Sequence, residues 1–89
     1  MSKSIEVWVI ERDKALETRD VNKLIEYLEK WTEKGLYEKE MLEQFKNADD
    51  KVKLGSMCKM IMNCTRISKE TKKWAKNELD KLGWSAEIL

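Results

Sequence analysis

Histidine and proline are both absent from this chain of 89 residues, and glycine occurs only three times. Without histidine the chain lacks the commonest general base and the commonest metal ligand, and it cannot form a Ser–His or Cys–His nucleophile pair. A chain so poor in turn-forming residues also suits a sheet-rich fold badly, because such folds need frequent tight turns. These absences favour a helical protein that is not an enzyme.

Cysteine is scarce as well, since the chain holds only Cys58 and Cys64. Two cysteines without histidine cannot build a structural zinc site alone. Because they are six residues apart on one predicted helix, the two thiols should lie on different sides of it. They would then be too far apart for a disulfide. We expect two buried, reduced thiols. No glycine-rich phosphate loop or calcium-binding loop occurs either, so we expect no catalytic residues, no cofactor and no metal.

Long apolar runs are also missing. The apolar stretch from Ile5 to Ile10 is interrupted by Glu6 and is not followed by a small-residue cleavage site. No stretch approaches the roughly 20 apolar residues that a membrane span needs. We therefore expect a soluble, cytoplasmic protein that forms a single helical domain over residues 1–89.

What the sequence does contain is helical periodicity with clear end signals. Asp20 and Ser68 are good N-caps, and Gly35 and Gly83 stand where a helix ends in a left-handed residue. The predicted fold class is all-α, a compact bundle of about five short helices. Their expected ranges are roughly 4–18, 21–34, 37–46, 50–64 and 69–82. The fourth should be the most buried, because its apolar residues spread most of the way around it.

Residues 5–10 are the ambiguous part of the chain, because their β-branched and aromatic side chains also suit a strand. No partner strand is evident, and Trp8 and Leu16 fit one helical face, so we prefer a helix and keep the strand as the alternative. On a helix, Val7 and Ile10 point away from Trp8. This second apolar face predicts contact with something else, such as a second copy of the chain.

The charges are divided unevenly along the chain. Residues 1–50 carry 9 Lys/Arg and 13 Asp/Glu, a net charge of −4, whereas residues 51–89 carry 9 and 4, a net charge of +5. Such a split indicates either that the two halves attract each other within the fold or that the basic half faces an anionic partner.

One segment resembles a known family. Residues 67–71, Ile-Ser-Lys-Glu-Thr, are followed by Ala75, Glu78-Leu79 and Gly83-Trp84. This pattern resembles the recognition-helix segment of helix-turn-helix and winged-helix repressors, over about 18 residues, although Lys72 and Lys76 stand where that family has buried apolar residues. The resemblance implies a small DNA-binding regulator that uses residues 54–84. Its candidate nucleic-acid surface is Arg66, Lys69, Lys72, Lys73 and Lys76.

The leading functional prediction is nevertheless a non-enzymatic protein–protein interaction domain, with DNA binding as the alternative. It would be a small adaptor or inhibitor, of a kind frequent in phages and mobile elements, and its partner would be another protein or a second copy in a homodimer. Aromatic and apolar anchors commonly carry the energy of such interfaces. The candidate partner surface is Val7, Ile10, Trp84 and Ile88.

Overall fold

Five α-helices make up the part of the chain that the computed structural model describes, residues 3–84, with side chains from residue 7 onward. They are α1 (Lys3–Glu17), α2 (Val21–Glu33), α3 (Lys39–Asn47), α4 (Asp50–Asn63) and α5 (Lys69–Leu82). The predicted all-α fold is confirmed, and every boundary lies within two residues of its expected position. The strand alternative for residues 5–10 is wrong, because α1 includes them.

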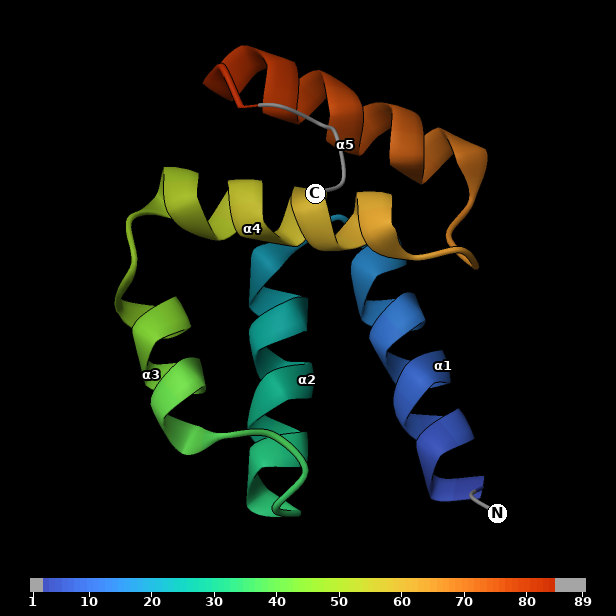
Figure 1. Ribbon diagram of the computed structural model, residues 1–89, viewed down its shortest axis with the longest axis vertical. Coiled ribbons are helices and arrows are strands. Elements are labelled where there is room, and N and C mark those ends of the chain that lie inside the picture. The colour runs from blue at the N-terminus through green and yellow to red at the C-terminus, as the bar shows by residue number, and fades with distance from the viewer. Residues whose placement is uncertain (1–2, 85–89) are drawn as a thin grey trace.

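The helices are arranged in layers (Figure 1). α2 packs against α1 on one side and α3 on the other, and these three helices form the lower part of the molecule as drawn. α4 crosses the ends of α1 and α2, and α5 lies over α4. Because α4 contacts both α2 and α5, it occupies the central position that its apolar pattern predicts.

The helix ends follow the signals in the sequence. The side chains of Asp20 and Ser68 each accept a hydrogen bond from an N–H in the first turn of the helix that follows, at 2.9 and 3.2 Å. Gly35 and Gly83 adopt φ values of +76° and +75°, which glycine reaches without steric cost. Asp49 takes the N-cap position of α4 but makes no side-chain capping bond.

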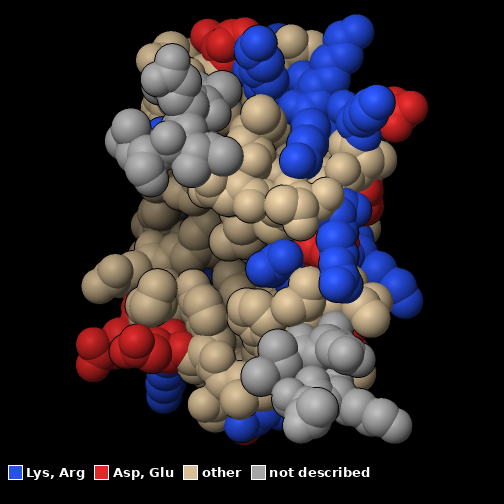
Figure 2. All heavy atoms as spheres, turned by 45° about the vertical axis from the view of Figure 1, so that its right-hand side comes forward, with Lys and Arg blue, Asp and Glu red and all other residues tan. Residues whose placement is uncertain are grey.

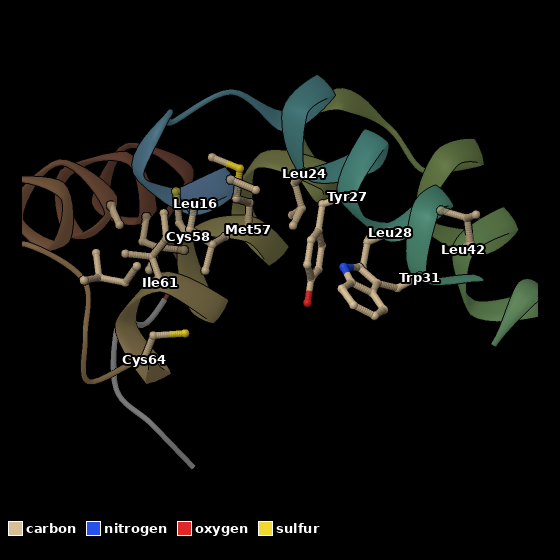
Figure 3. Close-up of a cluster of buried hydrophobic side chains, with 14 residues drawn as sticks. Leu16, Leu24, Tyr27, Leu28, Trp31, Leu42, Met57, Cys58, Ile61 and Cys64 are labelled. Atoms are coloured by element: carbon tan, nitrogen blue, oxygen red, sulfur yellow. The ribbon is translucent and has the colours of Figure 1, made fainter. Parts of the chain in front are cut away.

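The buried apolar side chains form one cluster to which all five helices contribute. Figure 3 shows Leu16, Met57, Cys58 and Ile61 gathered at one end of this cluster and Tyr27, Trp31 and Leu42 toward the other. The first end joins α1 to α4, and the second joins α2 to α3. This core fixes the outer helix α5, whose buried residues are Thr71, Ala75 and Leu79.

Gly55 lies buried in α4 beneath the ring of Trp84. A glycine inside a helix lets a neighbouring group approach closely, and at Gly55 that group is the indole that directly follows α5. The N–H of Trp84 donates to the carbonyl of Leu79 at 2.9 Å, which completes the turn after Gly83 and brings the ring back onto α4. The two helices are thereby joined at the end of α5.

We expect Gly55→Ala to destabilise the fold by about 1 kcal/mol, because overpacking by about 1–3 kcal/mol outweighs the gain in helix propensity. A Cβ at this position would lie 2.7 Å from Cε3 and Cη2 of Trp84 and closer still to Cζ3. Urea unfolding measures the change. The double variant Gly55→Ala/Trp84→Ala should lose less stability than the two single changes together, and full additivity would contradict the contact.

Candidate functional site

The most distinctive surface of the molecule is a group of basic side chains on the first half of α5. Lys69, Lys72, Lys73 and Lys76 recur at the spacing i, i+3, i+4 and i+7, which places them within about 100° of the helix circumference. Arg66 stands in the turn that precedes the helix. We call these five residues the basic face.

The basic face points outward because the other side of α5 is buried against the core. Thr71, Ala75 and Leu79 are 0–1% exposed. Lys72, at the edge of the face, is half-buried, and Lys76 is exposed. In the repressor family that α5 resembles, the positions of Lys72 and Lys76 hold buried apolar residues. The rotation of α5 about its own axis therefore differs from that of a repressor's recognition helix.

No carboxylate pairs with the basic face among the described residues. Six ion pairs occur there, and each involves a lysine or arginine outside the face. Glu70 lies at the edge of the face, yet it makes none of these pairs. Figure 2 shows Lys and Arg side chains gathered at the upper end of the molecule, where α5 lies. Five positive charges therefore lie close together without an ion pair to any carboxylate of residues 7–84.

A polar cluster holds the N-terminal end of α5 against the end of α1. The Glu17 carboxylate accepts hydrogen bonds from the N–H of Ser68 at 2.6 Å, from its Oγ at 2.9 Å and from Oγ1 of Thr71 at 2.5 Å. These bonds, above all the one from Thr71, lower the pKa of Glu17 below its usual value. A negative charge thus already occupies the N-terminus of α5, where the helix dipole favours it. We call this arrangement the Glu17 clasp.

Arg19 completes the clasp. Its Nε donates to Oγ1 of Thr71 at 3.3 Å, and its guanidinium lies 6.0 Å from the ring centroid of Trp74. Its backbone has φ +59°, in the left-handed region that costs a residue other than glycine about 1–2 kcal/mol. These contacts fix the rotation of α5, and hence the direction in which the basic face points.

Sequence reasoning missed the Glu17 clasp. Ser68 is recognisable as an N-cap, but Glu17 lies 51 residues before it. No local pattern connects two positions so far apart, and only the tertiary structure brings the end of α1 to the start of α5.

The four residues predicted to contact a protein differ in how exposed they are. Val7 and Ile10 are each 44% exposed, and both lie away from Trp8, whose ring packs 5.9 Å from that of Tyr27. Trp84 is half-buried with its ring over Gly55. Ile88 lies outside the described residues. Only Val7 and Ile10 therefore form an exposed apolar pair on one described helix.

Both cysteines are buried and carry no disulfide. Burial raises the pKa of Cys58 to about 11 and also raises the pKa of Cys64. A thiol with so high a pKa stays protonated at neutral pH and is a weak nucleophile. Among the side chains of residues 7–84, no three Cys, Asp or Glu are arranged to hold a metal ion. No helix in that range is both long and apolar enough to cross a membrane.

No protein-family model matches this chain, and neither a curated protein nor a solved structure is significantly similar to it. The likeness of α5 to repressor recognition helices consequently has no family match behind it. The functional argument rests on the chemistry of the described surface.

Proposed function

We propose that this protein is a non-enzymatic binding domain that docks on an anionic macromolecule through the basic face of α5. The observation that carries the proposal is the row of cations on one side of a well-anchored helix, with no carboxylate paired to them among residues 7–84. Binding rather than catalysis is supported by the lack of histidine and by the raised thiol pKa values.

The row of lysines works against the stability of α5. Lys69 and Lys73, and likewise Lys72 and Lys76, are like charges one turn apart, and each such pair opposes helix formation by about 0.2–0.5 kcal/mol. With the two i,i+3 pairs included, the total cost is about 1–2 kcal/mol. Lysines in the first turns also oppose the helix dipole. A bound polyanion would relieve both effects, so the arrangement suits a binding surface better than a merely solvated one.

A polyanionic resin such as heparin-agarose tests the proposal with two variants of equal charge. The face variant is K69Q/K73Q/K76Q, and the control variant is K23Q/K39Q/K51Q. All six lysines are exposed, and both variants change the net charge from +1 to −2. Gln and Lys have similar helix propensity, so both variants should fold.

We expect the wild type and the control variant to be retained at low salt and the face variant to pass through or elute much earlier. Circular dichroism of each variant before loading confirms that the helices are intact. Elution of the two variants at the same salt concentration would overturn the proposal, because net charge rather than the basic face would then govern retention.

A protein partner on α1 is the second candidate, favoured by the exposure of Val7 and Ile10. The occupant that the sequence suggests is a second copy of the chain. It ranks second because two side chains supply far less than the roughly 800 Å² per partner that a stable interface buries. Cytoplasmic location, as expected from the sequence, is compatible with either candidate and stays a prediction.

Sedimentation equilibrium separates the two candidates. We expect a monomer over tens of micromolar protein, and unchanged sedimentation in Val7→Ser/Ile10→Ser, because the exposed pair is too small to hold two copies together. A dimer that this double variant dissociates would instead make α1 the working surface.

A further inference from the structure

We infer, resting on the proposed function, that the anionic macromolecule is a nucleic acid whose phosphate backbone lies along the flank of α5, without reading of bases. The basic face supplies the electrostatic contacts, and the Glu17 clasp keeps the end of the helix out of the groove. The two features together define both the partner and the way it docks.

The chemistry of the basic face favours phosphates over an acidic protein. Four of its five residues are lysines, and it includes no apolar or aromatic side chain. The cores of protein–protein interfaces are depleted in lysine and rely on aromatic and apolar anchors. Lysine and arginine contacts to phosphate oxygens, by contrast, supply most of the affinity in sequence-independent nucleic-acid binding.

A membrane surface fits less well. Amphipathic helices bind membranes by placing an apolar face among the lipids below a basic one. The apolar side of α5, made of Ala75 and Leu79 with Thr71, is already buried in the protein at 0–1% exposure. The basic face could contact anionic lipid headgroups only electrostatically, without the insertion that normally accompanies such binding.

The length of the face matches a run of phosphates. Lys69 and Lys76 are seven residues apart, a rise of about 10 Å along the helix. Duplex DNA carries one charge per roughly 1.7 Å of its axis when both strands are counted, so about three phosphates of each strand lie within that distance. Four or five simultaneous contacts are therefore geometrically reasonable.

The Glu17 clasp determines how α5 approaches. Repressors of the helix-turn-helix type insert the N-terminal residues of the recognition helix into the major groove. Here that end carries the Glu17 carboxylate, bonded to Ser68 and Thr71. Inserting it would bring a negative charge toward the phosphates that border the groove. Docking along the lysines avoids this repulsion, and lysine contacts to phosphates carry no sequence information.

Fluorescence anisotropy with labelled duplexes of about 20 base pairs and two unrelated sequences, titrated at about 25 to 200 mM NaCl, tests the inference. The wild type should bind both sequences with affinities within about threefold of each other. Five phosphate contacts predict a slope of log K against log salt of about −4.5 for duplex DNA and about −3.5 for a single strand.

The face variant K69Q/K73Q/K76Q should bind at least about tenfold more weakly at 50 mM NaCl, with a slope reduced to about −1.8, because three phosphate contacts are lost. The control variant K23Q/K39Q/K51Q should bind as the wild type does. A preference of more than about tenfold for one duplex would overturn docking along the flank, since base reading discriminates by about 1–3 kcal/mol per contact.

Two further probes separate this inference from the proposed function. If poly-L-glutamate or anionic phosphatidylserine vesicles bind in a face-dependent way and DNA does not, the nucleic-acid inference is overturned while the proposed function stands. If DNA, poly-L-glutamate, the vesicles and heparin all fail to bind, or bind the face and control variants equally, both fail. Face-dependent binding to DNA that exceeds binding to the other two probes at equal charge concentration supports both.

Discussion

Leu79→Ala is expected to destabilise the protein by about 2–5 kcal/mol, the usual range for truncating a fully buried leucine. Leu79 has no exposed surface and lies on the buried side of α5, so its removal leaves a cavity in the core. A domain of this size is stable by only about 4–13 kcal/mol. The melting temperature should fall by roughly 10–25 °C, which differential scanning calorimetry measures directly.

Trp74→Ala is the informative comparison, because the helical spacing of residues 69–82 predicts that Trp74 lies in the core together with Thr71 and Ala75. The structure leaves it half-buried, with the Arg19 guanidinium beside its ring. We expect this change to cost about 1–2 kcal/mol, less than the 3–5 kcal/mol typical of a fully buried tryptophan. If Trp74→Ala proved more costly than Leu79→Ala, α5 would be rotated from the position described, and the basic face would point elsewhere.

The fold was largely predictable because its signals are local. A cap such as Ser68 and a stop such as Gly83 act within one turn of the chain, so they can be recognised without knowledge of the tertiary structure. The apolar spacing in between fixes the number of helices and their bounds to within two residues. At residues 5–10 the helical spacing of the buried side decides against the strand that the local propensity also allows.

The rotation of α5 was less predictable. Thr71 and Ala75 were assigned to the inner side correctly, but Leu79 rather than Trp74 lies at its centre. The large apolar surface of tryptophan favours the prediction of a core position. A side chain of this size is nevertheless often only partly buried, at the edge of a small core. The position of Trp84 over Gly55 was also missed, because it depends on how the turn after α5 folds back.

The candidate site was partly predictable. Arg66 and the four lysines were recognisable as a basic cluster in the sequence, and their helical spacing follows from the helix prediction. Whether carboxylates of residues 1–50 lie close enough to neutralise these cations depends on the tertiary structure. The described ion pairs show that this does not occur, since the acidic residues pair with other lysines and arginines. The described ion pairs therefore give no support to the first interpretation at the basic face, and the second stays a prediction.

Acidification should weaken the Glu17 clasp. Because the pKa of Glu17 is lowered in the folded protein, its ionised form is stabilised there relative to the unfolded chain. The stability it contributes is fully present above the unfolded pKa of about 4.3. That contribution is lost as the pH falls through the lower, folded pKa. Glu17→Gln removes the charge at every pH and retains one oxygen acceptor, so it separates this carboxylate from all the others.

We expect Glu17→Gln to cost about 1–2 kcal/mol at pH 7, since its hydrogen bonds are charge-assisted but partly open to solvent. Urea unfolding at pH 7, 5, 4 and 3 should show this difference shrinking below about pH 4 as the wild-type carboxyl becomes protonated. Glu40→Gln, an exposed change on α3, serves as the control and should be nearly neutral at pH 7. A difference for Glu17→Gln that stayed constant down to pH 3 would show that the clasp acts through its shape rather than its charge.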